Sequence, residues 1–453
     1  MGSVVIGTVL GWTSNISVEM KKGNYNELPI DDDSLGWIGS SATLGAMVMS
    51  FPMGFMCDKL GRKLSMLLLT IPIIIGWLLI INANSLVMIY IGRFICGMIA
   101  GAYCVSAPLY TSEIAEKEVR GTLGSCFQLF YTIGLLFTYI VALAVDMKIY
   151  TIVLTVMPLV FAAIFFFEPE TPIFRMKQKR EAEARESLLR LRGNKYDVDA
   201  ELREIKSALE EEDNNQVSFL KSIKKRSTKK AAIICFSLMF FQQATGVNAV
   251  VFYMSTIFES AGSGLDPKIA TTIVGVIQVV STFVSSLVID RLGRRILLIG
   301  SNFFMAISGC LLGIFFTLQE RELVDRQTLA TLGFLPIAAL SLFMIVYSMG
   351  IGPIPWMISS ELFPAEIKSL AISVAVTFNW FIAFLITKFY LNLKNAIGGD
   401  VTFYIFSVIG LVGTVFVSFV VPETKGKSFD QIQRELNGEK SSSDGIENLG
   451  YSN

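Results

Sequence analysis

Histidine is absent from this sequence, and charged residues are scarce. Asp, Glu, Lys and Arg together make up 17% of the 453 residues, and 38 basic residues balance 38 acidic ones. Without histidine the chain lacks the side chain best suited to carry protons near neutral pH and the commonest metal ligand. The zero net charge gives no sign of a nucleic-acid partner. The sequence therefore argues against proton relays, metal sites and nucleic-acid binding.

Cysteine is also infrequent, and recognisable catalytic patterns are missing. The six cysteines all lie in apolar stretches, where a free cysteine packs as a small hydrophobic residue. No pair of nucleophile and base, metal cluster or phosphate-binding loop stands out, and the glycine-rich stretches fall inside expected helices. We therefore predict that the protein is not an enzyme and uses no cofactor or metal.

Hydrophobic residues in long runs are what the sequence has in excess. They make up 53% of the chain, and the mean hydropathy is +0.58. A helix crosses a bilayer with about 20 mostly apolar residues. Runs of this kind lie at residues 3–16, 36–57, 64–82, 86–111, 121–145, 150–167, 231–258, 269–289, 296–317, 331–359, 370–391 and 401–421. The sequence predicts an all-α membrane protein with twelve transmembrane helices.

The first run, residues 3–16, is short for a span. Because apolar residues follow Met1 almost at once, we interpret the chain as lacking a cytoplasmic leader and part of helix 1, through truncation or as a short isoform. A cleaved signal peptide is the alternative, but the segment has no basic n-region and no clean cleavage site of small residues. We therefore count it as the first helix.

Basic residues mark one side of the membrane. They cluster in the loops after the second, fourth and eighth helices, at Lys59, Arg62 and Lys63, at Lys117 and Arg120, and at Arg291, Arg294 and Arg295. The positive-inside rule places these loops in the cytoplasm, with both termini on that side of a cell membrane. Asn15-Ile16-Ser17 is then a candidate N-glycosylation sequon on the outer side, although chance occurrence so close to the membrane explains it equally well.

A polar insert divides the chain. Residues 170–230 are rich in charge and show helical spacing over 179–192 and 200–212. We expect four parts along the chain. They are an N-terminal six-helix half at 1–169, a cytoplasmic helical linker at 170–230, a C-terminal six-helix half at 231–422, and a mostly disordered cytoplasmic tail at 423–453.

Three motifs occur twice, in the same order and after equivalent helices. The pairs are Asp58-Lys59-Leu60-Gly61-Arg62-Lys63 with Asp290-Arg291-Leu292-Gly293-Arg294-Arg295, Ser112-Glu113-Ile114 and Glu118-Val119-Arg120 with Ser360-Glu361-Leu362 and Glu366-Ile367-Lys368, and Pro169-Glu170-Thr171 with Pro422-Glu423-Thr424. One such loop could be simple membrane anchoring, but the ordered set indicates two parallel six-helix repeats.

These motifs resemble those of the sugar porter family of the major facilitator superfamily, over essentially the whole chain. Further similar segments are Gly92-Arg93-Phe94, Gln242-Gln243 with Gly246 and Asn248, Gly352-Pro353-Ile354-Pro355-Trp356, and Pro422-Glu423-Thr424-Lys425-Gly426. Within the family the chain is most similar to insect facilitated trehalose transporters and related glucose facilitators. The resemblance implies the major facilitator fold and the transport of a small neutral sugar across a lipid bilayer by alternating access.

Three amides on the seventh helix are the main substrate-binding candidates. A sugar presents hydroxyls that donate and accept hydrogen bonds, and apolar C–H faces, so a matching site needs amides and aromatic rings. Gln242, Gln243 and Asn248 lie within two turns, where amides are costly unless they line a cavity or bind partners. Hydrogen bonding between helices is the alternative role, and we favour the cavity.

The resemblance adds four further substrate-binding residues, namely Gln128, Gln278, Trp356 and Asn379. Without it, Trp356 and Trp380 could equally be aromatic residues of the membrane interface. Ser348, beside Tyr347, stands where many glucose facilitators have an acidic residue. This difference puts a preference for glucose in doubt.

The tenth expected helix, residues 331–359, and the repeated motifs are the candidates for moving parts. Gly352, Pro353 and Pro355 predict a bend, because proline removes a backbone donor. The resemblance favours a hinge at this bend, and a static kink is the alternative.

A cytoplasmic gate of opposite charges is expected from Asp58, Arg62, Glu113, Glu118, Arg120, Glu170, Asp290, Arg294, Glu361, Glu366, Lys368 and Glu423. These can pair when that face closes and separate when it opens. Lys368 replaces the more usual arginine and forfeits bidentate contact, which predicts a weaker second lock.

The spans contain no acidic residue that could couple transport to protons. Symporters of the resembled family carry an acid on helix 1 after a Gly-aromatic pair, but here Thr13 follows Gly11-Trp12, and the charges well within spans are Arg93 and Lys388. We therefore predict a facilitative uniporter for a hexose or trehalose, functional as a monomer. A proton-coupled symporter and, less favoured, a sugar sensor that does not transport are the alternatives.

Overall fold

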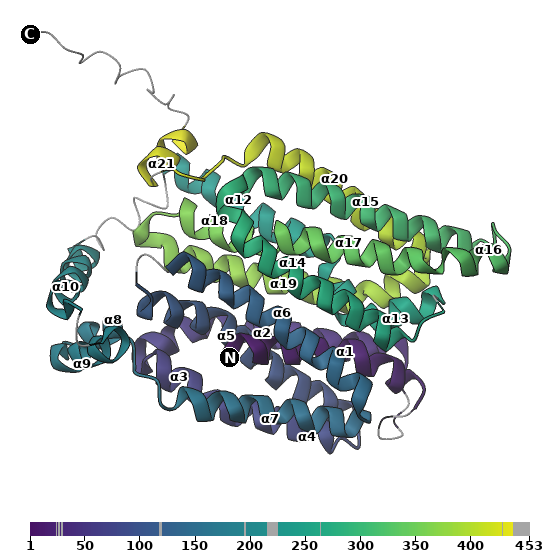
Figure 1. The fold of residues 1–453 in the computed structure, drawn as a ribbon, viewed down its shortest axis with the longest axis horizontal. Helices are drawn as coiled ribbons and strands as arrows, with labels where there is room; N and C mark the ends of the chain where they lie inside the picture. Colours follow the sequence, from purple (N-terminus) through teal and green to yellow (C-terminus); the bar gives the residue numbers. More distant parts are fainter. Residues whose placement is uncertain are drawn as a thin grey trace, which may run out of the picture.

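The computed structural model describes residues 1–23, 25, 28, 30–116, 120–193, 196–214, 225–262, 264–427 and 429–437. These residues form helices joined by short loops, and no strand occurs among them. The prediction of an all-α protein is confirmed, and Figure 1 shows the helices lying side by side in one elongated bundle.

The N-terminal half builds six passages through the bundle. Its helices are α1 (Gly2–Lys21), α2 (Asp32–Leu60), α3 (Arg62–Leu68), α4 (Thr70–Ile81), α5 (Leu86–Ile114), α6 (Arg120–Ala144) and α7 (Met147–Phe165). Only Leu69 separates α3 from α4, so these two form a single passage. Most bounds agree with the predicted runs to within a few residues.

Three shorter helices follow α7 and lie beside one end of the bundle (Figure 1). They are α8 (Pro172–Lys177), α9 (Glu181–Arg192) and α10 (Val198–Asn214). Alanine and leucine side chains of α9 and α10 form a small separate core, which includes Ala184, Leu188 and Leu202. The helical spacing predicted over 179–192 and 200–212 therefore corresponds to real helices.

The C-terminal half also builds six passages, two of which are broken. Its helices are α12 (Arg226–Ala244), α13 (Val247–Ala261), α14 (Pro267–Leu292), α15 (Arg294–Glu320), α16 (Arg326–Thr331), the 3₁₀ turn η2 (Leu332–Phe334), α17 (Leu335–Met349), α18 (Ile354–Leu362), α19 (Ala365–Ile397) and α20 (Gly399–Val420). The seventh passage is α12 with α13, and the tenth is α16 to α18. The helix α21 (Phe429–Asn437) follows the last passage.

Eleven helices of the described residues are long and apolar enough to cross a membrane. The remaining passage, α1, has 20 residues and continues past the predicted run of 3–16; at 1.5 Å per residue it is about 30 Å long, enough for a bilayer core. Residues 2–18 are all buried, and α1 packs against α5, α6, α7 and α13. This central position accounts for its polar residues and speaks against a signal peptide.

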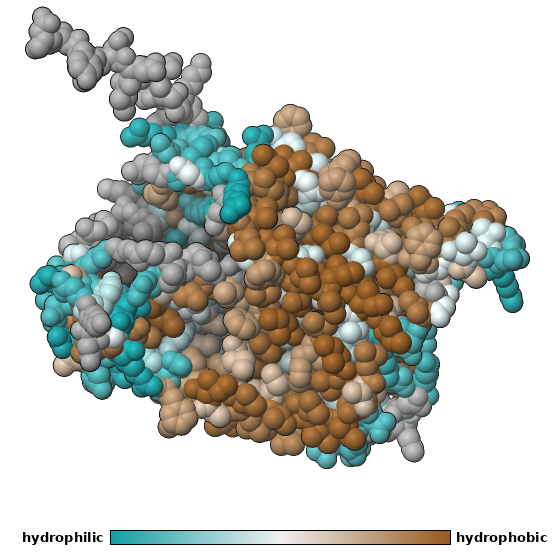
Figure 2. Space-filling model, in the orientation of Figure 1, coloured by the Kyte–Doolittle hydropathy of each residue, from teal (hydrophilic) through white to brown (hydrophobic). Residues whose placement is uncertain are grey.

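The outer surface of the bundle carries an apolar belt. Figure 2 shows hydrophobic residues covering the middle of the molecule, with hydrophilic residues at both ends. Large apolar side chains such as Ile71 and Phe419 are 62% and 85% exposed. So much exposed apolar surface is stable only against lipid. The chain is a multi-pass membrane protein.

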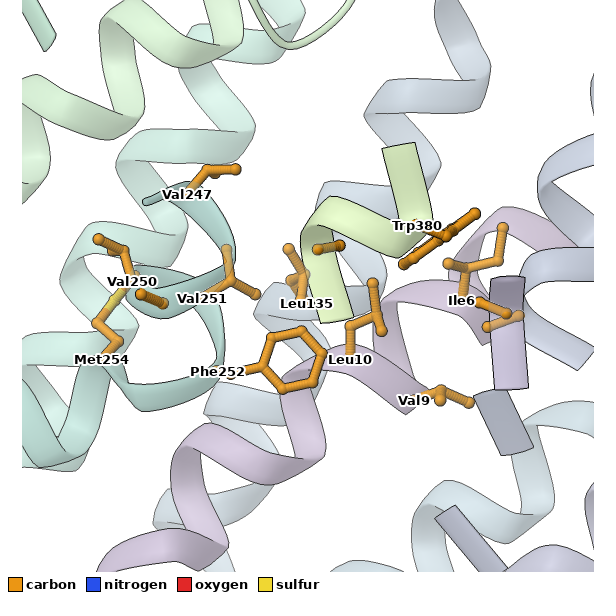
Figure 3. Packing of buried hydrophobic residues seen from close by; sticks show 14 of the residues in the cluster. Ile6, Val9, Leu10, Leu135, Val247, Val250, Val251, Phe252, Met254 and Trp380 are labelled. Carbon is orange, nitrogen blue, oxygen red and sulfur yellow. The ribbon is translucent and has the colours of Figure 1, made fainter. Parts of the chain in front are cut away.

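The two halves meet along three pairs of helices. They are α2 with α19, α6 with α14, and α1 with α13. Buried side chains from α1, α6, α13 and α19, including Leu10, Leu135, Phe252 and Trp380, share one hydrophobic cluster (Figure 3). The buried core is therefore continuous between the halves.

The bundle has two chemically different ends. We call the end that carries the repeated loops 58–63 and 290–295, together with α8–α10 and α21, the motif end, and the end that carries α16 and the start of α2 the opposite end (Figure 1). At the motif end, α21 packs on α12 and α18, with Ile432 and Leu436 buried. The tail predicted as mostly disordered thus contains a docked helix, while residues 438–453 lie outside the described residues.

Candidate substrate site

Four of the seven predicted substrate-binding residues form one hydrogen-bonded series, which we call the amide chain: Asn248, Gln243, Asn379 and Gln242. Nδ2 of Asn248 donates to Oε1 of Gln243 at 2.8 Å, and Nε2 of Gln243 donates to Oδ1 of Asn379 at 2.9 Å. Nδ2 of Asn379 then donates to Oε1 of Gln242 at 2.8 Å. All four side chains are at least 94% buried. The series joins α12, α13 and α19.

The amide chain has a fixed direction. Nε2 of Gln242 donates to the carbonyl oxygens of Ile351 and Gly352, both at 2.8 Å. Because a carbonyl can only accept, Gln242 must present its nitrogen to them and its oxygen to Asn379. The same logic passes back along the series to Asn248, whose Nδ2 is the first donor. The chain is therefore polarised from α13 towards the break between α17 and α18.

Two helix breaks adjoin the amide chain. Gly246, between α12 and α13, has a φ of +89°, a conformation that favours glycine, and it separates Gln243 from Asn248. The second break lies between Met349, where α17 ends, and Ile354, where α18 begins. The bend predicted from Gly352, Pro353 and Pro355 is present.

The other three predicted residues do not take part in the amide chain within the described structure. Gln278 is 1% exposed on α14, Gln128 is half-buried on α6, and Trp356 is half-buried on α18. Because α6 packs against α14 across the two halves, Gln128 and Gln278 lie on helices of one interface. Their contact with a substrate stays a prediction.

The sequence alone did not decide whether Trp380 lies at the membrane interface. It is 6% exposed and belongs to the buried cluster that also contains Ile6 and Leu10 of α1 (Figure 3), so it is not part of an interface belt. Its indole nitrogen is buried without a hydrogen-bond partner among the described residues, and so is the hydroxyl of Ser348. In the sequence, its position directly after Asn379 was the one feature that linked Trp380 to the predicted substrate-binding residues.

The first set of predicted gating charges pairs inside the N-terminal half. Arg62 is 3% exposed; its Nη2 lies 2.8 Å from Oε1 of Glu113 and 3.3 Å from Oδ1 of Asp58. Thr171 donates to the other oxygen of Glu113 at 2.5 Å. The carboxylate of Glu170 accepts the backbone N–H groups of residues 62, 63 and 171. This carboxylate therefore caps the first turn of α3.

The second set repeats this arrangement inside the C-terminal half. Glu423 accepts the backbone N–H groups of residues 294 and 295, each at 3.0 Å, at the start of α15. Desolvation raises the pKa of Glu423, but hydrogen bonds from the backbone of residues 425, 294 and 295 prevail and hold the pKa below its usual value. Nη2 of Arg294 lies 3.5 Å from Oε1 of Glu361. This contact is longer than its N-terminal counterpart and more exposed.

Four of the predicted gating residues have side chains that the structure does not describe. Glu118 lies outside the described residues, and the side chains of Arg120, Asp290 and Glu366 are likewise not described. Burial lowers the pKa of Lys368, against the opposite effect of nearby Glu361. The pairs that the structure does describe at the motif end lie within a half.

Comparison with known proteins identifies the family. The family model described as "Sugar (and other) transporter" matches residues 3–436. The chain belongs to this sugar transporter family. A protein named facilitated trehalose transporter Tret1 from Aedes aegypti is 38% identical over 439 residues, which cover 97% of this chain and 54% of that protein. The Tret1 of Polypedilum vanderplanki is also 38% identical, over 97% of this chain and 86% of that protein. The chain thus spans about half the length of the Aedes relative.

Solved structures place this sugar transporter family member in the major facilitator fold. The xylose transporter XylE of Escherichia coli in a partially occluded inward-open conformation superposes with a TM-score of 0.78, at 22% identity, over 94% of this chain and 97% of that one. An inward-open structure of XylE gives 0.79, over 96% and 97%. The predicted resemblance and fold are confirmed, and the family is one of transporters rather than enzymes.

A cation with no acidic partner among the described residues lies deep in this transporter-family bundle. Arg93 of α5 is fully buried; its Nη1 donates to the carbonyl of Val9 at 2.7 Å, and its Nη2 donates to Oγ1 of Thr13 at 2.9 Å. Nε donates to the carbonyl of Ile38 at 3.3 Å, and the guanidinium lies 4.9 Å from the ring centre of Trp12. Within the described residues, its partners are uncharged and do not titrate.

At the opposite end, polar contacts join the two halves. We call them the cross-half ties: Ser14–Ser255, Ser17–Thr256, Lys22–Glu259, Glu19–Lys268, Asp32–Asn395 and Asp33–Lys388. Lys388, 5% exposed, also lies 4.6 Å from the ring centre of Trp37. The halves of this transporter-family member are therefore closed against each other at the opposite end.

The candidate glycosylation site is not accessible. Asn15 is fully buried in α1, and its Nδ2 donates to the hydroxyl of Tyr150 at 3.4 Å. A glycan attaches to this nitrogen and needs it exposed outside the membrane. The burial of Asn15 therefore favours chance occurrence of the sequon.

Proposed function

We propose that this protein is a facilitative transporter that moves a small neutral sugar, trehalose or a hexose, across the membrane by alternating access. The observation that carries the proposal is the amide chain, an uncharged series of donors and acceptors buried in the bundle. Sugar hydroxyls both donate and accept, so they match amides better than charges. The trehalose-transporter names of relatives at 38% identity support the same substrate class.

The substrate-binding residues in this proposal are Gln243, Asn248 and Asn379, together with Gln128, Gln278 and Trp356. Trp380, the residue after Asn379 on α19, carries a buried indole nitrogen without a partner among the described residues. An unpartnered buried donor costs about 1–3 kcal/mol, which a substrate hydroxyl would relieve. Gln242 belongs to the same set, and it ends the amide chain at the α17–α18 break.

Passive transport is favoured over proton symport by the surroundings of Arg93. A carboxylate beside this arginine could exchange protons during the cycle, but Thr13 offers only a hydroxyl there. Two backbone carbonyls and the Trp12 ring complete the compensation of the charge. None of these groups changes charge between pH 5 and 8.

The transport cycle follows from the charges at the two ends. The positive-inside rule supports placing the motif end in the cytoplasm, with both termini on that side of the cell membrane. The cross-half ties then close the external side. The charges of the motif end, which here pair within each half, would pair across the halves when the cytoplasmic side closes. Because one chain supplies both halves, a monomer suffices for this cycle.

Counterflow in proteoliposomes tests the proposal. Full-length protein loaded with unlabelled trehalose or glucose is expected to accumulate the labelled sugar transiently, without an imposed proton gradient. Gln243→Ala is expected to weaken the apparent affinity about tenfold, because it removes two links of the amide chain.

Three results would contradict this function. Binding without counterflow would indicate a sensor. Accumulation driven only by an imposed pH gradient would indicate a symporter. Wild-type behaviour of Gln243→Ala for every transported sugar would remove the amide chain from the substrate site.

A further inference from the structure

The helix α2 of the N-terminal half packs along α19 of the C-terminal half (Figure 1). Near the opposite end the two helices are in close contact, since a Cβ on Gly36 would lie 2.9 Å from the carbonyl oxygen of Lys388, and one on Gly39 would meet α19 at 3.0 Å. Nearer the motif end, side chains within 47–52 of α2 and 374–381 of α19 line a groove of about 620 Å³ instead. The junction of the halves is therefore tight at one end and hollow towards the other.

This groove is apolar and open to the outside of the bundle. Its walls include Val48, Phe51 and Pro52 of α2, Phe236 of α12, and Val374 and Phe378 of α19. Val48 and Val374 are 45% and 42% exposed, so the groove opens on the apolar belt. The hydroxyl of Thr377, the one polar side chain among the lining residues, already donates to the carbonyl of Ser373. Because lipid surrounds this belt, hydrocarbon fills such a groove in preference to water.

The groove lies at the depth of one leaflet. At 1.5 Å per residue, Pro52 is about 12 Å from Leu60, where α2 ends, and Val374 is about 14 Å from Ala365, where α19 begins. Both of these helix termini are at the motif end. A bilayer core of about 30 Å gives each leaflet about 15 Å of hydrocarbon. The occupant that reaches this depth from the side is an acyl chain of the leaflet at the motif end.

Two lysines lie between the groove and the motif end, one on each side of the junction. Lys59 lies two turns beyond Pro52 on the same face of α2, and Lys229 lies two turns before Phe236 on the same face of α12. Both lysines are exposed, and in the part of the chain that the structure describes neither has an acidic partner. Exposed lysines at a membrane surface attract anionic headgroups.

We propose that an anionic phospholipid of this leaflet binds at the junction, with an acyl chain in the groove and its phosphate beside Lys59 and Lys229. The acid next to Lys59, which is Asp58, is already bound to Arg62 and does not neutralise the lysine. Because α2 and α12 belong to different halves, one lipid molecule contacts both halves.

A lipid in this place acts on the transport cycle, and this part of the proposal rests on the proposed function. The two halves must approach each other at the motif end when that end closes. An acyl chain in the groove occupies the space into which α2 and α19 would move. The bound lipid therefore favours the state seen here, in which the cross-half ties are formed at the opposite end.

Quenching of tryptophan fluorescence by brominated lipid tests the site. Full-length Phe236→Trp is placed in nanodiscs of phosphatidylcholine and phosphatidylglycerol, with bromine on the acyl chains of one lipid or the other, and the signal of the parent chain is subtracted. Two lysines predict at least about tenfold preference for phosphatidylglycerol. Phe419→Trp, at a position 85% exposed near the motif end of α20, is the control without a preference. Equal quenching of Phe236→Trp by both lipids, or none by either, as under a second copy of the chain, would overturn the proposal.

Matched variants separate the headgroup from the acyl chain. In the Phe236→Trp chain, Lys229→Gln is expected to lower the preference about fivefold, whereas Lys148→Gln, an exposed lysine of the opposite end, leaves it unchanged. Val374→Phe fills the groove and is expected to abolish the preference. Val408→Phe, 58% exposed on α20, is its control and retains it. Equal effects within either pair would contradict the site.

Cysteine labelling separates the action of the lipid from the proposed function. In a chain without its six native cysteines, maleimide labelling of Ser17→Cys is expected to be several-fold slower with phosphatidylglycerol than with phosphatidylcholine alone, because the opposite end stays closed. Val374→Phe should remove this dependence on lipid. Labelling of the parent that ignores the lipid would overturn the proposed action. A chain that binds phosphatidylglycerol with the expected preference, yet exchanges no sugar, would refute the transported substrate and leave the lipid site established.

Discussion

Lys388 of α19 bridges the two halves by binding Asp33 of α2, with Nζ 2.5 Å from Oδ1. The lysine comes from a helix far along the chain and is 5% exposed, and it lies over the ring of Trp37. Gly36 makes the approach possible, since a Cβ there would lie 2.9 Å from the Lys388 carbonyl oxygen. Among the described residues, Lys388 is the most buried member of the cross-half ion pairs.

Asp33→Asn is expected to loosen the opposite end. The carboxylate is 57% exposed, so the pair contributes only about 1 kcal/mol, which corresponds to a several-fold change in the population of open states. Maleimide labelling of Ser17→Cys, in a chain without its six native cysteines, is expected to become several-fold faster. Asp31→Asn removes the same charge but only caps α2, and it should leave labelling unchanged. Equal acceleration by both variants would show that the pair itself does not hold the halves.

Thr13→Asp is expected to introduce sensitivity to pH. It places a carboxylate where the Thr13 hydroxyl now lies, 2.9 Å from Nη2 of the buried Arg93. Such a group can exchange protons as its surroundings change during the cycle. Counterflow by the wild type should be indifferent to an imposed pH gradient, whereas the variant should respond. Thr13→Asn, with similar shape and no titration, is the control; a gradient response in the wild type would instead favour symport.

Gly293→Ala is expected to destabilise the motif end. Gly293 has a φ of +91°, and a Cβ there would lie 2.7 Å from Oε2 of Glu423. The strain and the disturbed carboxylate cap together cost about 1–3 kcal/mol, which should lower the melting temperature of the purified protein. Gly300→Ala, in the helix α15 that follows Gly293, is the control and should be neutral or slightly stabilising, because its Cβ would meet no atom of another described segment within 4 Å. A similar loss in both variants would argue against a special role for the loop.

The two locks are expected to differ in strength. Glu113 is 7% exposed in its contact with Arg62, whereas Glu361 is 27% exposed and lies 3.5 Å from Arg294. Glu113→Gln should therefore destabilise the fold by about 3 kcal/mol, as for a broken buried pair. Glu361→Gln should cost less than about 1 kcal/mol, as for a partly exposed pair. Thermal unfolding of the two variants side by side checks the order, and equal losses would contradict it.

Local sequence features predicted the passages and the repeated loops well. A run of apolar side chains must be helical in lipid, because each backbone group then finds its partner within the segment. The motifs 58–63 and 290–295 likewise predicted equivalent loops. Gly61 and Gly293 share a positive φ, and each faces the glutamate that follows the sixth passage of its half, Glu170 or Glu423. In α1 the apolar run ended before the helix did, because Ser14 and Ser17 are satisfied by the other half.

Pairings between distant residues were beyond the sequence. The type and spacing of Gln242 and Gln243 are compatible with a sugar ligand or with a bond between helices, and only the positions of Asn379 and of the Ile351 carbonyl show which amide faces which partner. Trp380 and Asn15 were similarly ambiguous, because one residue on a helix carries no information about the surface that will cover it.

By itself the sequence determined which segments cross the membrane, that they form two similar halves, and that the bundle carries amides rather than acids at its centre. These properties follow from hydropathy, spacing and residue type, which are local. Tertiary structure alone decided that Gln242 donates to the backbone at the α17–α18 break and that Lys388 meets Asp33. The reason is physical: a hydrogen bond or ion pair depends on distances of a few ångströms between helices, and those distances are set only when the helices pack together.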